Sequence, residues 1–412
     1  MPSRSDITHF GAGPASLPTD VLEEAAKALL DYNATGLGIA EHSHRSPLAA
    51  DIINQAKADL ATCLDIPDDY EILFMQGGGT VYDSGQFSAA VYNFVGAWVA
   101  RKHKEVFGDT QGDPADHPEL IQQLKQAVDN DLRIDYLVTG SWSQKASAEG
   151  ERLLGSKHIN IAADARKTNG GKFGTIPDES NWKLSKDAAF VYFCDNETVD
   201  GVEFPGFPKS LEPGPDGNGP VVVADMSSNI LTRKIPVRKF SAIFFGAQKN
   251  LGLTGVTVVV IRKSFLPPII SQPSVALMRH LALPIPPVIF QYETIAKNNS
   301  LYNTLSIFDV YVAGRVLKKL LQTYNPNKVE AQQAVTDKKA QLIYDAIEAF
   351  PEVYKIIPNA AVRSRVNICF RVTKGGEVDA AEKAFLQEST AQGLTGLKGH
   401  RSLGGMHSQN VS

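Results

Sequence analysis

Short apolar runs alternate with amphipathic stretches through the first two thirds of the chain, a pattern typical of α/β proteins. Apolar runs rich in Val, Ile and Phe predict strands, and apolar positions at helical spacing predict helices. The predicted strands are Glu71–Met75, Asp135–Val138, Ala188–Cys194, Val221–Ala224, Ser241–Phe245 and Val256–Arg262. The predicted helices are Thr19–Leu30, with Thr19 as its N-cap, Pro47–Leu64 and Gln86–Val106. Segments rich in Asp, Gly and Pro predict surface loops at Gly108–Pro118 and Pro205–Pro220.

The pattern changes after Ser264, where prolines recur as far as Pro287 and predict a long irregular crossing. Two predicted helices and one strand follow, at Ile307–Tyr324, Lys328–Phe350 and Val366–Val372. We therefore predict an α/β fold with a large domain over residues 17–300, in which a mainly parallel sheet lies between helices. A smaller α+β domain would comprise residues 1–16 with residues 301–412, the first dozen residues packing on it.

Length and charge narrow the class of protein. A chain of 412 residues is long enough for about two or three domains. The net charge of −4 includes no basic excess, which argues against nucleic-acid and membrane-surface binding. Cys63, Cys194 and Cys369 lie far apart without a CxxC pair, so we predict neither a metal site nor a disulfide framework. Without a signal region or a bilayer-length apolar run, the sequence predicts a cytoplasmic protein.

Polar segments follow five of the predicted strands. In open α/β sheets, ligands bind at the carboxyl ends of the strands. We therefore expect these segments to meet at one edge of the sheet and form a ligand site. The segments are Gln76–Thr80, Thr139–Ser143, Asp195–Thr198, Asp225–Ser228 and Gly246–Lys249.

Lys249 follows one of these strands almost directly. Lysine is poorly tolerated at the buried end of a strand unless its amine is used. An amine held in a dry pocket has a lowered pKa and attacks carbonyl carbons, which is the chemistry that binds pyridoxal phosphate. The alternative is a lysine whose ammonium group reaches solvent along an apolar stem.

Four further features of the strand ends suit the same cofactor. Gly77–Gly79 would leave backbone N–H groups open to a phosphate, and Trp142 would stack on a flat ring. Asp225 would hold a protonated pyridine nitrogen, and Thr198 would bond the ring oxygen. Each has an ordinary alternative, respectively a glycine turn, a core tryptophan, a helix N-cap and a turn cap. Their order and common location favour the cofactor site.

Nine segments match one known family. They are Phe10–Ala15, His42–Ser46, Gln76–Thr80, Gly140–Trp142, Asn196–Gly201, Ala224–Ser228, Gly246–Gly252, Tyr302–Thr304 and Leu397–Arg401. Through them the chain resembles the phosphoserine aminotransferases, class-V aminotransferases that are fold-type I pyridoxal-phosphate enzymes of serine biosynthesis. The resemblance covers nearly the whole chain.

The resemblance implies a role for particular residues toward the cofactor. Lys249 would bear pyridoxal 5'-phosphate as an aldimine and shuttle the Cα proton, while Asp225 would pair with the pyridine nitrogen. Trp142 would stack on the ring and Thr198 would contact its phenolic oxygen. The cofactor phosphate would be held by Gly79, Thr80 and Gln248, and by Asn303 and Thr304 from the other subunit of a homodimer.

The resemblance also implies the reaction. Glutamate would pass its amine to the cofactor and then to 3-phosphohydroxypyruvate in a ping-pong cycle, giving 2-oxoglutarate and 3-phosphoserine. The substrate phosphate would be bound by two His-Arg pairs, His44 with Arg45 and His400 with Arg401. Arginine suits this task because its planar fork makes paired hydrogen bonds to phosphate oxygens.

Two departures from the family stand out. Val81–Ser84 intervene before Gly85-Gln86-Phe87, where the family has no such insertion, and predict a longer turn at the phosphate cradle. His407 stands where the family has an arginine that grips the substrate α-carboxylate, and Ser408–Ser412 do not resemble the family, so we expect a truncated C-terminus.

These departures leave an alternative open, a protein that binds the cofactor but is catalytically impaired. A related pyridoxal-phosphate enzyme with another substrate is a further alternative, against which the two His-Arg pairs argue. The absence of a GxGxxG motif after the first predicted strand argues against a nicotinamide dehydrogenase.

Overall fold

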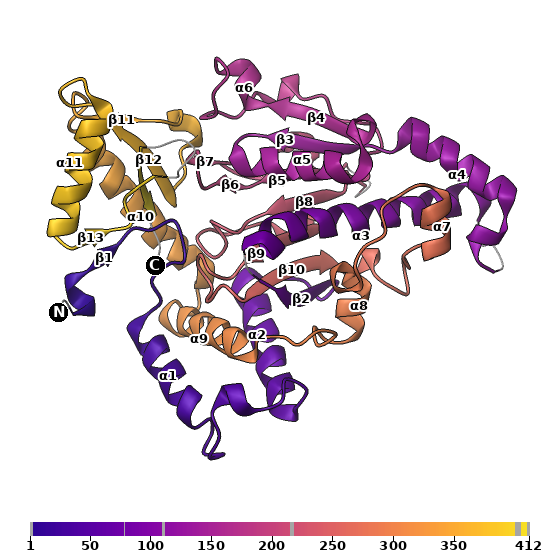
Figure 1. The fold of residues 1–412 in the computed structure, drawn as a ribbon, viewed down its shortest axis with the longest axis horizontal. Helices are drawn as coiled ribbons and strands as arrows, with labels where there is room; N and C mark the ends of the chain where they lie inside the picture. Colours follow the sequence, from indigo (N-terminus) through magenta and orange to yellow (C-terminus); the bar gives the residue numbers. More distant parts are fainter. Residues whose placement is uncertain (1–2, 78, 109–111, 215–217, 400–404, 410–412) are drawn as a thin grey trace.

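A seven-stranded sheet forms the centre of the larger part of the molecule (Figure 1). The computed structural model describes residues 3–77, 79–108, 112–214, 218–399 and 405–409. Strand β10 runs antiparallel to both of its neighbours, and the remaining pairs are parallel. In sheet order the strands are β2 (Tyr70–Gln76), β10 (Val256–Arg262), β9 (Ala242–Gly246), β8 (Val222–Asp225), β5 (Phe190–Cys194), β3 (Ile134–Val138) and β4 (Ile159–Asp164).

Both faces of this sheet are covered by helices. Successive strand residues point to opposite faces, so Phe244 and Phe245 of β9 belong to two different buried clusters. The Phe245 cluster includes side chains of α2 (Pro47–Leu64) and α9 (Ile307–Thr323). The Phe244 cluster includes side chains from a second group of helices, and this double burial explains why the strands read as nearly continuous apolar runs. That group is α3 (Gly79–Phe107), α4 (Pro118–Asp131), α5 (Ser141–Leu154), α7 (Val275–His280) and α8 (Tyr292–Lys297).

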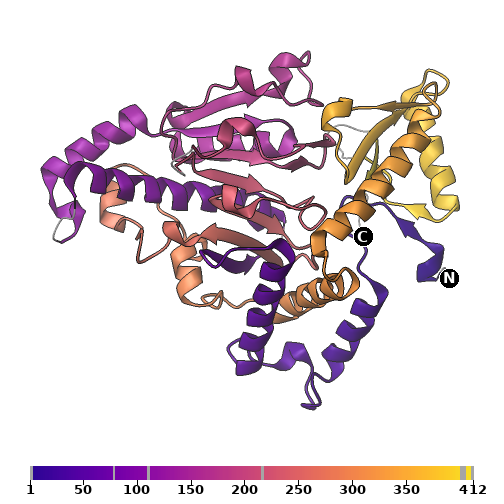
Figure 2. The ribbon, with the colours of Figure 1, turned by 180° about the vertical axis from the view of Figure 1, so that it is seen from behind.

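A smaller sheet of three antiparallel strands lies beside the carboxyl ends of the large sheet (Figure 2). Its strands are β11 (Tyr354–Ile356), β12 (Asn367–Val372) and β14 (Met406–Gln409). Side chains of α10 (Lys328–Glu348) and α11 (Val378–Ala391) complete its core. Near the N-terminus, β1 (Thr8–His9) pairs in parallel with β13 (Leu394–Thr395). The domain boundaries at residues 17 and 300 stay a prediction.

The predicted strands agree with the structure to within two residues at each end. Strand β4 was not predicted, because it lies at the edge of the sheet and most of its residues are only half-buried. It therefore lacks the continuous apolar run that marks the central strands. The helix α6 (Ala165–Thr168) follows it directly.

Two predictions about helix starts are wrong. The helix α1 (Thr19–Leu30) has Pro18 rather than Thr19 at its N-cap, and the Thr19 hydroxyl instead accepts a hydrogen bond from Arg4 Nε at 3.1 Å. Val81–Ser84 do not lengthen a turn, because α3 begins at Gly79 and includes them. Four residues add about one helical turn, so the helix absorbs the insertion. By contrast, α2 begins as expected, with Ser46 Oγ accepting from Ala49 N at 3.2 Å.

None of the helices in the described ranges is both long and apolar enough to cross a membrane. Nor do three or more His, Cys, Asp or Glu side chains gather there as a possible metal ligand set.

Candidate active site

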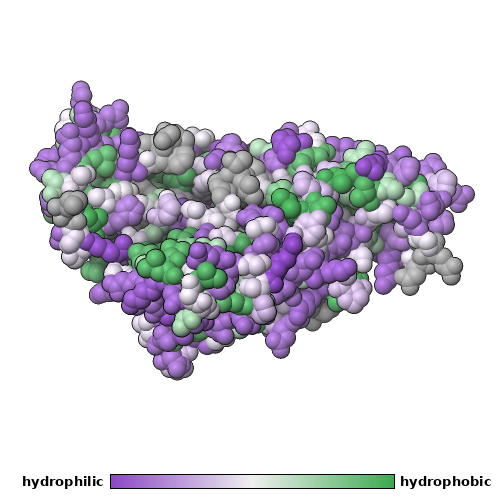
Figure 3. Space-filling view, turned by 60° about the horizontal axis from the view of Figure 1, so that its bottom comes forward, coloured by the Kyte–Doolittle hydropathy of each residue, from purple (hydrophilic) through white to green (hydrophobic). Residues whose placement is uncertain are grey.

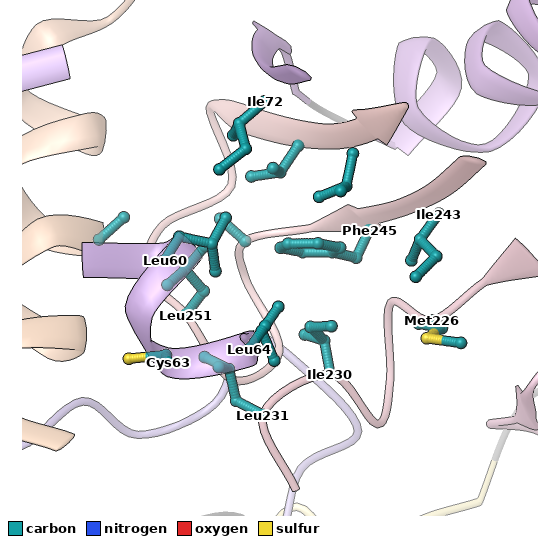
Figure 4. Close-up of a cluster of buried hydrophobic side chains, with 14 of the residues drawn as sticks. Leu60, Cys63, Leu64, Ile72, Met226, Ile230, Leu231, Ile243, Phe245 and Leu251 are labelled. Atoms are coloured by element: carbon teal, nitrogen blue, oxygen red, sulfur yellow. The ribbon is translucent and has the colours of Figure 1, made fainter. Parts of the chain in front are cut away.

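The turn that carries Lys249 is anchored on both sides. It follows β9, and Ala247 N donates to Val256 O of the neighbouring strand at 3.0 Å. Leu251 N then donates to Ala247 O at 3.0 Å, and both of these side chains are fully buried. Leu251 packs with Phe245 in the buried cluster shown in Figure 4. The half-buried Lys249 is therefore held at a fixed place past the carboxyl end of a central strand.

The N-terminal segment packs directly on this turn. Lys249 Nζ donates a hydrogen bond to Ala12 O, and Ala15 N donates to Gln248 O at 3.0 Å. Gly13 lies between them with φ of +122°, and a Cβ placed there would lie 2.7 Å from Lys249 Nζ. Glycine is therefore favoured at position 13 by the backbone conformation, and a side chain there would displace the end of the lysine side chain.

Lys249 lines a large cleft between the two sheets. The volume of this cleft is about 1160 Å³, and Trp142 and Thr198 also line it. Among the described residues that line the cleft, Asp200 is the acidic one. The cationic lining residues are Arg166, Lys172, Lys249, Lys355, Arg371 and Lys398. A cleft in which positive side chains predominate attracts anionic ligands.

Two buried carboxyl groups hold the start of α5, the helix whose first turn carries Trp142. Glu197 Oε2 accepts from Trp142 N at 2.8 Å, and Glu197 Oε1 accepts from Ser143 N at 2.9 Å. Asp200 Oδ2 accepts from Ser141 N at 2.6 Å. Three backbone N–H groups that a helix start leaves unsatisfied are thus satisfied by residues from another part of the chain.

The same two carboxyl groups resist ionisation. Glu197 is fully buried, and this burial together with the neighbouring Asp200 raises its pKa to about 8. Burial also raises the pKa of Asp200. Glu197 therefore keeps a proton at pH values where an exposed glutamate is charged.

The stability of the protein is expected to fall as the pH rises from about 4.5, the ordinary pKa of a glutamate, to about 8. In this window the unfolded chain has released the Glu197 proton and the folded protein retains it. Raising the pH therefore favours unfolding, by about 1.4 kcal/mol per pH unit for one proton. Thermal melting of the wild type and of Glu197→Gln across this range measures the effect. An equal pH slope in the two proteins would contradict the assignment.

Asp225 and Gln248 lie next to the cleft but are not among its lining residues. Asp225 ends β8 and is 6% exposed, and its Oδ1 accepts from Ser227 N at 2.9 Å. It pairs in register with Cys194 at the end of β5 and with Phe244 of β9. The buried carboxylate thus lies between the strand that leads to Thr198 and the strand that leads to Lys249.

Other predicted site residues are not brought to the Lys249 cleft within one chain. His44 and Arg45 precede α2, and neither lines the cleft. Asn303 lines a separate small cavity with Gln76, and Gln76 Nε2 donates to Thr304 O. A single chain therefore assembles the centre of the predicted site without these four residues.

Of the four remaining predicted site residues, the structure describes two. Gly79 and Thr80 begin α3, where backbone N–H groups are available to an anion. His400 and Arg401 lie outside the described residues. The nearest described residues are Gly399 and Gly405, where Gly399 N donates to Gly405 O at 2.8 Å, and Gly399 and Met406 line the cleft.

The structure adds lining residues that the sequence did not indicate. Lys172 follows the unpredicted strand β4, so no strand end marked it. Lys355 and Arg371 come from β11 and β12 of the smaller sheet. Glu197 and Asp200 belong to the family motif Asn196–Gly201. Two acidic residues close to Thr198 are the feature from which the sequence could have predicted buried carboxyl groups at this site.

The chain matches the class-V aminotransferase family over residues 7–106 and 119–407. It is 42% identical to a phosphoserine aminotransferase of Saccharomyces cerevisiae over 407 residues, which is 98% of this chain and 92% of the relative. It is 36% identical to a phosphoserine aminotransferase of Drosophila melanogaster, covering 97% of this chain and 92% of the relative.

Solved structures with similar folds carry the same name. A phosphoserine aminotransferase from Bacillus circulans subsp. alkalophilus has a TM-score of 0.76 and 34% identity, covering 97% of this chain and 91% of that one. A phosphoserine aminotransferase from Trichomonas vaginalis with bound PLP has a TM-score of 0.74 and 31% identity, covering 97% and 94%.

Proposed function

Because the chain belongs to the class-V aminotransferase family, we propose that it transfers the amine of glutamate to 3-phosphohydroxypyruvate, giving 2-oxoglutarate and 3-phosphoserine. It is a pyridoxal-phosphate-dependent transferase of fold type I. Curated relatives similar over nearly its whole length are phosphoserine aminotransferases, so a place in serine biosynthesis follows.

The residues around the cleft fit pyridoxal phosphate. One cleft is lined by the amine of Lys249, the indole of Trp142 and the hydroxyl of Thr198. The carboxylate of Asp225 is buried one strand away, where a cationic ring nitrogen would balance its charge. The start of α3 supplies N–H groups for a phosphate. These groups are chemically matched to the ring, aldehyde and phosphate of the cofactor.

The charge of the cleft is the observation that carries the choice of substrate. Phosphoserine and 3-phosphohydroxypyruvate each have a phosphate and a carboxylate, and glutamate has two carboxylates. Lys172, Lys355 and Lys398 line the cleft on different sides, and its acidic lining residue, Asp200, has a raised pKa. A cationic cleft beside a reactive amine is suited to amino and oxo acids with two anionic groups.

Each residue then has a defined task. When bound, pyridoxal phosphate supplies an aldehyde that accepts an amine and a ring that withdraws electrons from the substrate Cα. Lys249 Nζ binds the cofactor covalently and, when released, removes and returns the proton at the substrate Cα. Trp142 would lie against the ring face, Thr198 would donate to the ring oxygen, and Asp225 would keep the ring nitrogen protonated.

We place His44, Arg45, Asn303 and Thr304 in the active site of a second copy of the chain, as a homodimer. The support is that one chain leaves these residues away from its own cleft. Tyr302 beside them is 41% exposed, and a large exposed side chain of this kind suits an interface. On the face shown in Figure 3, hydrophobic patches lie between hydrophilic regions, and such patches suit a surface that a partner covers.

The visible spectrum of the purified protein tests the proposed function. The bound cofactor absorbs in the visible range, and glutamate should convert it to the amine form while releasing 2-oxoglutarate. Adding 3-phosphohydroxypyruvate should restore the first spectrum and release phosphoserine. Hydroxypyruvate, which lacks the phosphate, serves as the matched control. A spectrum that glutamate leaves unchanged, or one restored equally well by hydroxypyruvate, would contradict the proposal.

Removing Arg45 or Arg401 is expected to weaken substrate binding selectively. Losing a charge-assisted hydrogen bond costs about 1.5–3 kcal/mol, so the KM for phosphoserine should rise about tenfold to a hundredfold in Arg45→Ala and Arg401→Ala. Cofactor affinity should change little. Arg279→Ala, on α7 and not among the cleft-lining residues, is the control. An unchanged KM in both variants would remove the phosphate assignment.

The alternative of a catalytically impaired enzyme depends on His407. Residue 407 pairs in register with Cys369 of β12, and Cys369 lines the cleft. Histidine is largely neutral at pH 7 and lacks the planar fork with which arginine grips a carboxylate. His407→Arg is therefore expected to raise kcat/KM about tenfold, the value of one added charge-assisted hydrogen bond. If the two proteins have equal kcat/KM, position 407 does not limit catalysis.

A further inference from the structure

We propose that Glu197 is a positioning residue for the reaction. It joins the first turn of α5, which carries Trp142, to the β6–β7 hairpin, which carries Thr198. This sets the spacing between the ring-stacking wall of the cleft and the wall that contacts the ring oxygen. The inference rests on the proposed function, since the tasks of Trp142 and Thr198 belong to it.

The hairpin side of this connection is short and buried. Strand β6 (Asn196–Glu197) pairs antiparallel with β7 (Val202–Glu203), and Glu197 faces Val202 in register. Thr198 follows β6 immediately, is 8% exposed and lines the cleft. Because Thr198 is the residue after Glu197, the hydrogen bonds that hold the glutamate side chain also restrain the backbone that carries the threonine.

The helix side is held by several hydrogen bonds to the same carboxyl group. Glu197 Oε2 accepts from Trp142 N, and Glu197 Oε1 accepts both from Ser143 N and from Ser143 Oγ, the latter at 2.5 Å. Ser143 Oγ in turn accepts from Thr139 N at 3.0 Å and from Gly140 N at 3.2 Å. The end of β3 and the start of α5 are therefore tied to one side chain, which fixes where the indole enters the cleft.

The two carboxyl groups also pack closely against Gly140. A Cβ placed on Gly140 would lie 2.4 Å from Glu197 Cγ and 2.7 Å from Asp200 Oδ2. The φ of Gly140 is −168°, an extended conformation open to any residue, so space rather than backbone geometry excludes a side chain there. The two carboxyl groups lie against the bare backbone where β3 turns into α5.

This arrangement differs from ordinary helix capping because Glu197 is far in sequence from the helix start that it caps. An N-cap usually supplies a side chain from the residue preceding the helix, which here is glycine and has none. Glu197 instead lies 55 residues beyond Trp142 in the chain. A cap of this kind ties the helix to the hairpin as well as stabilising it, and both elements line the cleft.

The experiment compares Glu197→Gln with a matched control on the same helix. Glu149→Gln makes the same chemical change in α5, at a carboxylate that binds Arg152 and Ser88 and does not line the cleft. For each full-length protein, the dissociation constant for pyridoxal phosphate, the visible circular dichroism of the bound cofactor and the melting temperature are measured. We expect Glu197→Gln to weaken cofactor binding about tenfold and to reduce the dichroism, because its amide cannot accept all three hydrogen bonds. Glu149→Gln should leave both cofactor signals unchanged.

The outcomes separate a failure of this inference from a failure of the proposed function. Trp142→Phe should also change cofactor dichroism, and if it does not, the task proposed for Trp142 is wrong. If Trp142→Phe changes it while Glu197→Gln binds cofactor like the wild type, the positioning role is overturned. A lower melting temperature in Glu197→Gln with unchanged cofactor signals overturns it as well. Should Glu197→Gln not fold, Ser143→Ala removes the hydroxyl that bonds Glu197 Oε1, Thr139 N and Gly140 N, and wild-type cofactor signals in that variant overturn the inference.

Discussion

Alanine in place of Lys249 is expected to abolish covalent attachment of the cofactor and to lower kcat by about a thousandfold or more. The amine is the group that the turn after β9 holds in the cleft, against Ala12 O and beside Gly13. Without it, the protein loses both the nucleophile that binds the aldehyde and the base that moves the Cα proton. Reduction with borohydride followed by peptide mapping measures the attachment, and single-turnover kinetics measure the proton transfer.

The cleft itself supplies the control for this experiment. Lys172 and Lys355 also line it, so they are competing candidates for the attachment. Both are exposed, whereas Lys249 is half-buried. Lys172→Ala and Lys355→Ala should therefore retain the reducible link. If borohydride still attaches cofactor to Lys249→Ala, the assignment of the nucleophile is wrong.

Methionine in place of Arg233 is expected to destabilise the protein by about 3–5 kcal/mol. The Arg233 side chain is 9% exposed, and its partners Asp195 and Glu203 are 1% and 3% exposed. Arg233 Nη2 donates to Asp195 Oδ1 at 2.6 Å. Removing the guanidinium leaves the Asp195 carboxylate buried with Asn229 as its remaining polar side-chain contact in the described network. Urea denaturation of the two proteins measures the loss.

This network also connects the two sheets. Glu203 Oε1 accepts from Arg365 Nη2 at 2.7 Å, and Arg365 lies just before β12 of the smaller sheet. Burial opposes the ionisation of Glu203, but the Arg365 and Arg233 guanidinium groups outweigh it and lower its pKa. Lys234→Met is the control, because its ion pair with Glu330 is 61% and 56% exposed and should contribute little. Equal denaturation midpoints for Arg233→Met and Lys234→Met would contradict the expected role of the buried network.

The central strands and the core of the site could be predicted from the sequence. Strands such as β9 and β10 are buried on both faces, so their residues form apolar runs that local pattern is enough to recognise. Polar segments that follow the parallel strands must lie at one edge of the sheet, whatever the strand order. Lys249, Trp142 and Thr198 do line one cleft there. The cofactor and the family agree with the comparisons, while the tasks of individual residues stay predictions.

Other features depend on contacts that no local pattern records. The side chains of Lys355 and Arg371 join the cleft because β11 and β12 pack beside the large sheet, more than a hundred residues beyond Lys249. Glu197 meets the start of α5 across 55 residues of chain. Comparison with the family motif predicts that Val81–Ser84 lengthen a loop, yet these residues belong to the helix α3.

The sequence by itself therefore determined the central strands and the chemistry at their ends, because periodicity and strand-end residues are properties of neighbouring positions. Tertiary structure decided which of these ends share a cleft, what charge surrounds them and which carboxyl groups keep a proton. Those properties arise from burial and from pairs of residues far apart in the chain, whose distance is set by the order of strands in the sheet. The four site residues that lie away from the cleft of their own chain extend the same principle, since we expect a second copy to bring them to it.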